Sequence, residues 1–139
     1  LYPFLIVEGG FNSGLMMAQV TAAALVSESK ALSFPASVDS IPTSDDKEDH
    51  VSMGPLAGQK MMTCIENAKQ VLGIEIMSSC QAIDLRFTLK STDNIQTAHA
   101  IIREKVDYLE KDRILHNDLQ EIFAIINSGN LLKGLQRNV

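Results

Sequence analysis

Apolar residues recur along this chain every three to four positions, and no useful stretch alternates apolar and polar residues as a strand would. This spacing predicts four helices, at about residues 12–32, 53–86, 92–112 and 117–127. Residues that end helices stand at the expected places, with Pro35 after the first helix and Gly129 after the last. The pattern therefore predicts an all-α fold built on long helices.

The second predicted helix is the longest, because residues 53–86 contain no proline beyond Pro55 in the first turn, where proline is tolerated. Such a helix would extend roughly 50 Å. Its second half, residues 74–85, is apolar or small nearly all round, which is typical of a helix buried on every side. Four helices of one chain cover such a stretch poorly, so we expect packing partners from other subunits or further polypeptide.

Residues 33–52 are predicted to be an ordered polar loop between two long helices. The loop contains two prolines, several hydroxyl side chains and an acidic run, Asp45, Asp46, Glu48 and Asp49. Carboxylates are favoured before a helix start by the helix dipole. Judged by residue type alone, these acids are explained as capping and surface charge.

Composition and charge limit the classes of protein to which this chain can belong. A chain of 139 residues with 45% hydrophobic content fits a single globular unit, residues 1–139. The net charge of −5 argues against nucleic acid or an anionic membrane as a partner. No apolar run approaches the ~18 residues of a membrane span.

The spacing of the cysteines and histidines indicates neither a disulfide nor a metal site. Cys64 and Cys80 would lie roughly 24 Å apart on one helix, too far for a disulfide, which favours reduced thiols and a cytoplasmic protein. His50 follows two acids and is interpreted as a hydrogen-bonded structural residue rather than a catalyst. His99 and His116 are not spaced with carboxylates as a metal site. Asp84 and Arg86 are interpreted as a structural ion pair or an inter-subunit contact.

Five blocks in the same order carry a resemblance to a known family. They are residues 12–14 (Asn-Ser-Gly), 22–28 (Ala-Ala-Ala-Leu-Val-Ser-Glu), 35–44 (Pro-Ala-Ser-Val-Asp-Ser-Ile-Pro-Thr-Ser), 48–54 (Glu-Asp-His-Val-Ser-Met-Gly) and 81–86 (Gln-Ala-Ile-Asp-Leu-Arg). Together they resemble the C-terminal part of the aromatic amino acid lyases, in particular their histidine-selective members. The resemblance implies a C-terminal fragment with long antiparallel helices from the central helix bundle of that family.

The resemblance also implies an activity, the elimination of ammonia from L-histidine to give trans-urocanate in a cytoplasmic homotetramer, with this chain supplying one wall of the active site. Glu48 matches the position where histidine-selective members carry an active-site glutamate, so it is expected to bind substrate and to be catalytic. A carboxylate accepts a charge-assisted hydrogen bond from an imidazole, which a phenyl ring cannot offer. Lys47 replaces the glutamine that relatives commonly carry, and could pair with Glu48.

Members of this family bind no separate cofactor and make an electrophile, 4-methylidene-imidazol-5-one, from an internal Ala-Ser-Gly. This chain contains no such tripeptide, and Ala36-Ser37-Val38 has valine where glycine is needed. The electrophile is therefore expected from residues outside the fragment, and the isolated fragment is expected to be inactive.

Two alternatives stay open on the sequence. The parent could be a tyrosine ammonia-lyase or aminomutase, since those can share the glutamate. In a different class of function, the chain could be a non-catalytic helical scaffold or oligomerisation module.

Overall fold

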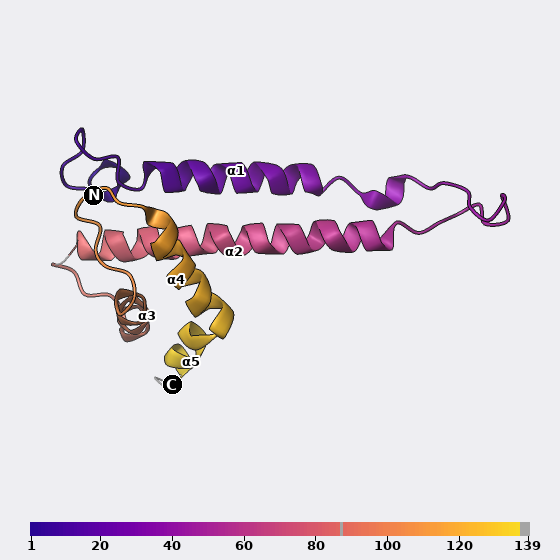
Figure 1. The fold of residues 1–139 in the computed structure, drawn as a ribbon. Coiled ribbons are helices and arrows are strands. Elements are labelled where there is room, and N and C mark those ends of the chain that lie inside the picture. The colour runs from indigo at the N-terminus through magenta and orange to yellow at the C-terminus, as the bar shows by residue number, and fades with distance from the viewer. Residues whose placement is uncertain (87, 137–139) are drawn as a thin grey trace.

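The computed structural model describes residues 1–86 and 88–136 (Figure 1). Its helices are α1 (Met16–Leu32), α2 (Gly54–Asp84), α3 (Asp93–Arg103), α4 (Leu115–Ser128) and α5 (Asn130–Gln136), with single 3-10 turns η1 (Pro3–Leu5) and η2 (Ala36–Val38). The described residues form no β-strand beyond two isolated bridges. The predicted all-α fold is confirmed.

Helices α1 and α2 form a long antiparallel hairpin, and the loop that joins them lies at the end away from α3, α4 and α5 (Figure 1). The buried amide of Asn67 on α2 donates to the Glu28 carboxylate at 2.7 Å and to the Ser29 hydroxyl at 3.3 Å, both on α1. The amine of Lys60 also donates to the carbonyl of Phe34 just beyond α1. Polar contacts therefore join the two helices near the loop end of α1, and the predicted pair of long antiparallel helices is present.

Helix α1 begins at Met16, later than the predicted start near residue 12. Gly14 has a φ of 54°, and Asp112 accepts hydrogen bonds from the backbone N–H of Ser13 at 2.7 Å and of Gly14 at 2.8 Å. A carboxylate nearly one hundred residues away thus satisfies donors that would otherwise belong to a longer helix. Helix α2 begins and ends within two residues of its predicted bounds.

Helix α3 ends at Arg103, so the prediction that it continues to about residue 112 was wrong. Val106 and Leu109 are still buried, as the apolar spacing predicted, but in irregular backbone. The Gln81 amide binds both the N–H and the carbonyl of Leu109, while Arg103 and Arg113 donate to the carbonyls of residues 106–108. Side chains therefore take the hydrogen bonds that helix continuation would have used.

The core lies at one end of the hairpin, where α3 and α4 pack against the second half of α2 (Figure 1). Its most buried side chains are Ile6, Ile102, Ile122, Gln81 and Val106. Within residues 74–85 only Glu75 and Ser79 are exposed. The chain's own elements bury Ile74, Met77, Cys80 and Gln81 and leave most of the other residues half-buried, so the expectation that outside partners complete the cover stays a prediction.

Exposed apolar side chains also lie along α1 and α2. Side chains there with at least 40% of their area exposed are Met17, Val20, Val26, Leu56, Met61, Met62, Ile65 and Leu72. Cys64 and Cys80 both lie on α2 and are free thiols, as their spacing predicted. In the described part of the chain, no helix is long and apolar enough to cross a membrane.

Candidate functional site

The polar segment between α1 and α2 carries the residue that the family resemblance selects. Ser40 joins the two ends of this segment by hydrogen bonds. The Ser40 hydroxyl accepts from the Val51 N–H at 2.9 Å and lies 3.4 Å from the Val51 carbonyl oxygen. The segment between these residues extends away from the helices (Figure 1). The acidic run therefore sits at the tip of a closed loop, far from the core.

The tip is a tight hairpin turn that contains no glycine. Thr43 and Glu48 face each other in an isolated antiparallel bridge, with the Thr43 N–H donating to the Glu48 carbonyl at 3.0 Å and the Glu48 N–H returning a bond at 3.3 Å. Between them Ser44, Asp45 and Asp46 have φ values of 56°, 58° and 60°. Three successive left-handed residues are costly for side chains other than glycine, although aspartate tolerates the region better than most.

Glu48 points one carboxylate oxygen back toward its bridge partner. Its Oε2 accepts a hydrogen bond from the Thr43 hydroxyl at 3.2 Å, and the side chain is otherwise exposed. No ion pair among the described residues joins Lys47 to Glu48, so the suggested pairing of these neighbours is not formed here. The Thr43 hydroxyl thus orients the Glu48 carboxylate, which remains accessible to a ligand that approaches the loop.

The other candidates in this loop are exposed and do not converge. His50 and the acids Asp45, Asp46 and Asp49 all face solvent. No group of three or more His, Cys, Asp or Glu side chains in residues 1–86 and 88–136 could hold a metal ion. The arrangement offers a single positioned carboxylate, suited to hydrogen bonding with a cationic or N–H-bearing ligand.

A second cluster of charges joins α2 to α3, and it corrects the predicted pairing of Asp84 with Arg86. Asp84 Oδ2 accepts from Arg103 Nη2 at 2.6 Å and from Nε at 2.9 Å, while Oδ1 lies 2.8 Å from His99 Nε2. His99 and Arg103 are four residues apart on α3 and so share one face. The partner of Asp84 is therefore on another helix, which sequence spacing could not reveal.

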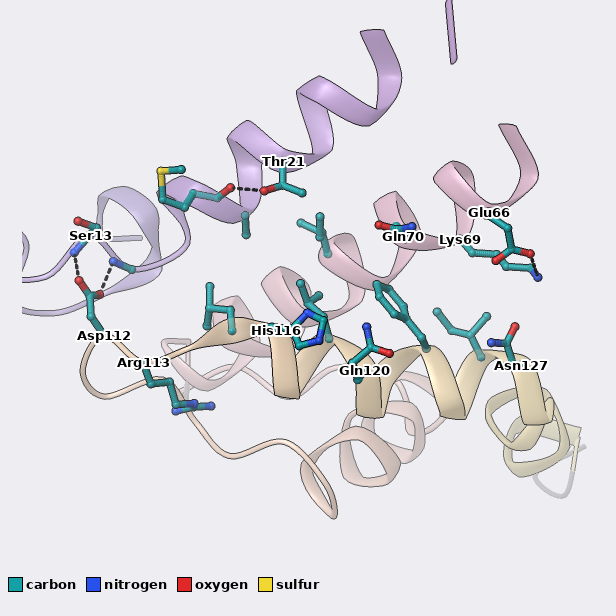
Figure 2. Close-up of a pocket in the computed structure, with 18 residues that line it drawn as sticks. Ser13, Thr21, Glu66, Lys69, Gln70, Asp112, Arg113, His116, Gln120 and Asn127 are labelled. Atoms are coloured by element: carbon teal, nitrogen blue, oxygen red, sulfur yellow. Dashed lines mark hydrogen bonds and ion pairs between the residues drawn. The ribbon is translucent and has the colours of Figure 1, made fainter. Parts of the chain in front are cut away.

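A hollow with a volume of about 760 Å³ lies between α1, α2 and α4 (Figure 2). Among the polar residues that line it, Glu66 and Lys69 pair at 2.7 Å, and Asp112 binds the backbone of Ser13 and Gly14. His116 and Gln120 face it from α4 (Figure 2). Glu48 does not line this hollow, so it is separate from the loop tip.

Sequence reasoning missed Thr43, which lies five residues before Glu48. A signal did exist, because Ser-Asp-Asp between the two residues is a turn-forming run that would bring them opposite each other. The long-range contacts of Gln81 and Asp112 had no such signal.

Comparison with known proteins matches this chain to one family. Residues 1–104 match the family model described as aromatic amino acid lyase. Over 142 residues the chain is 49% identical to a histidine ammonia-lyase of Photorhabdus laumondii, covering 96% of this chain and 28% of that protein. A histidine ammonia-lyase of Natranaerobius thermophilus is 45% identical over 139 residues, covering 100% and 27%.

Solved structures agree with these similarities. Histidine ammonia-lyase from Trypanosoma cruzi superposes with a TM-score of 0.95 at 40% identity, covering 100% of this chain and 27% of that one. Tyrosine aminomutase from Streptomyces globisporus superposes with a TM-score of 0.90 at 29% identity, covering 99% and 26%. The chain therefore spans about a quarter of the length of the proteins it matches.

Proposed function

The chain belongs to the aromatic amino acid lyase family, and on that basis we propose that it is the C-terminal part of a histidine ammonia-lyase. The complete protein would eliminate ammonia from L-histidine to give trans-urocanate. The observation that carries this proposal is the 49% and 45% identity to curated histidine ammonia-lyases over nearly the whole chain. This segment would supply one wall of the active site.

Within that site we assign Glu48 the contact with the substrate imidazole. Its carboxylate lies at the exposed tip of the loop, with one oxygen held by Thr43. An imidazole presents N–H donors and positive charge, which a carboxylate binds with a charge-assisted hydrogen bond. In a dry site the same carboxylate would be left unpaired by a phenyl ring, which favours histidine as the substrate.

The family's electrophile is not made from residues of this chain. No Ala-Ser-Gly occurs in the sequence, and Ala36, Ser37 and Val38 form an ordinary 3-10 turn. Cyclisation requires the backbone nitrogen of a glycine, and Val38 carries a branched side chain at that position. The electrophilic group would come from residues outside this chain, so the chain alone is expected to be inactive.

Related chemistry on a tyrosine is the second candidate. The tyrosine aminomutase of Streptomyces globisporus superposes over 99% of this chain with a TM-score of 0.90. A carboxylate at Glu48 could accept from a phenol as well as from an imidazole. Offering the complete protein L-histidine and L-tyrosine separately distinguishes the two, because only histidine yields urocanate.

Replacing Glu48 in the complete protein tests the proposal. Glu48→Gln keeps the shape and one acceptor but removes the charge, which costs about 1.5–3 kcal/mol for binding alone and more if the charge acts in the transition state. We expect turnover of L-histidine to fall at least about tenfold, measured as urocanate formation, while the protein stays folded.

Asp45→Asn is the matched control, because Asp45 is an exposed carboxylate of the same turn and asparagine tolerates its positive φ. This variant should keep its turnover. Unchanged turnover in Glu48→Gln would mean that Glu48 is only a carboxylate near a helix start.

We also infer that the complete protein is a cytoplasmic homotetramer. The family resemblance supports this assembly, as does the apolar surface that α1 and α2 leave exposed. Sedimentation of the complete protein checks the tetramer directly, and a stable monomer would exclude it.

A further inference from the structure

The turn that carries Glu48 is built from a strained backbone. Ser44, Asp45 and Asp46 are all left-handed, and none of them is glycine. Conformations of this kind persist where the surrounding structure enforces them, and they cluster at functional sites. Here the enforcing contacts are the two backbone hydrogen bonds between Thr43 and Glu48. The strained turn therefore fixes which residue lies opposite Glu48.

Residues opposite each other in an antiparallel bridge project their side chains to the same face, whereas successive residues project to opposite faces. Thr43 is therefore placed to reach the Glu48 carboxylate, and Lys47 is not. The Thr43 hydroxyl donates to Glu48 Oε2 at 3.2 Å. No described residue hydrogen bonds to Oε1, so that oxygen is free for another donor.

We propose that Thr43 is a positioning residue for Glu48: its hydroxyl holds Oε2 and so directs Oε1 toward the substrate ring. This inference rests on the proposed function of Glu48. A glutamate has three rotatable side-chain torsions, and a carboxylate that is free to rotate seldom occupies the reactive geometry. A misplacement of about 1 Å at a reacting group can cost about 100-fold in rate.

Thr43→Val tests this in the complete protein, because valine keeps the branched shape of threonine and removes only the hydroxyl. We expect kcat for L-histidine to fall about tenfold with little change in KM, since the lost contact serves the transition state more than binding. Thr43→Ser restores the donor and should return activity to within about threefold of the original protein.

Thr63→Val is the matched control. Thr63 is an exposed threonine of α2, whose hydroxyl binds the Gln59 carbonyl of its own helix. The same substitution there should leave kcat unchanged. If Thr43→Val does not yield folded protein, Thr43→Ala takes its place, because alanine also lacks the hydroxyl and avoids the branched side chain.

A double-mutant cycle separates positioning from general loop stability. If Thr43 acts through Glu48, adding Thr43→Val to Glu48→Gln should lower kcat by less than about twofold further. Losses that multiply in the double variant would overturn the inference while leaving the role of Glu48 intact. Full activity in Glu48→Gln would instead refute the proposed role of Glu48, and the inference with it.

Discussion

At the scale of single residues, Gln81 shows how a polar side chain can be part of a core. It is 2% exposed, and its amide donates to the carbonyls of Leu5 at 3.0 Å and Leu109 at 2.9 Å. Its oxygen accepts from the Leu109 N–H at 3.0 Å. One side chain thus joins the N-terminal segment, α2 and the irregular segment after α3.

We expect Gln81→Leu to destabilise the chain by about 3 kcal/mol or more, because it leaves the buried N–H and carbonyl of Leu109 and the part-buried carbonyl of Leu5 without partners. Chemical denaturation at fixed protein concentration measures the loss. Gln59→Leu, an exposed glutamine on the same helix, is the control and should change stability by less than about 0.5 kcal/mol. Equal effects at the two sites would contradict this account.

The two thiols of α2 should differ in reactivity. Burial raises the pKa of Cys80, with the Arg103 charge lowering it in part and Asp84 raising it further. Since the thiolate is the nucleophile, Cys64 should be alkylated at least about tenfold faster than Cys80 at pH 8. Mass spectrometry of the labelled chain over time checks the order, and faster labelling of Cys80 would refute it.

The same raised pKa has a consequence for stability in alkali. A thiol whose folded pKa exceeds its unfolded pKa stabilises the fold below the unfolded value, and this contribution is lost as pH rises through the folded value. A Cys80→Ala variant should therefore lose less stability than the original chain between neutral and strongly alkaline pH. Denaturation across that range measures the difference.

At the scale of elements, two of the three glycines of α2, Gly58 and Gly73, have different surroundings. A Cβ added to Gly73 would overlap the ring of Phe123 on α4, whereas one added to Gly58 would meet nothing within 4 Å. Gly73 is therefore a point of close approach between helices, and Gly58 is only a weak helix former.

We expect Gly58→Ala to stabilise the chain by about 0.5–1 kcal/mol through helix propensity. Gly73→Ala should destabilise it by about 1–3 kcal/mol, because the overlap outweighs the same gain. Thermal unfolding of the two variants side by side tests the contrast. A stabilised Gly73→Ala would show that the Phe123 ring moves aside freely.

Elements defined by local sequence could be predicted, and those defined by distant side chains could not. Apolar spacing located α2, and Gly129 at a φ of 68° ends α4 as expected. The end of α3 was missed because several of the competing hydrogen bonds come from Gln81 and Arg113, which lie outside the helix. Glu48 is a candidate only through the family resemblance, and its hydrogen bond with Thr43 is seen only in the structure.

At the scale of the whole molecule, the exposed apolar side chains of α1 and α2 lead to a prediction of self-association. Met61, Met62 and Leu72 are each at least half exposed on α2. Isolated apolar residues are normal on a surface, but a series along two paired helices marks an interface. We expect the 139-residue chain to associate at micromolar concentration. Sedimentation that shows only monomer, with no binding of a hydrophobic dye, would contradict this.

Because α2 is long, a small tilt of this helix in the core would displace the loop that carries Glu48. Its 31 residues extend about 46 Å, and about 28 Å of that length separates Gly73, where α4 packs, from Gly54 at the loop end. Tilting the helix by about 2° about Gly73 would move the loop end by about 1 Å, a misplacement that can cost about 100-fold in rate at a reacting group. Catalytic accuracy at Glu48 would thus depend on how rigidly the second half of α2 packs in the core. Substitutions near Gly73 would then slow the reaction without touching the substrate.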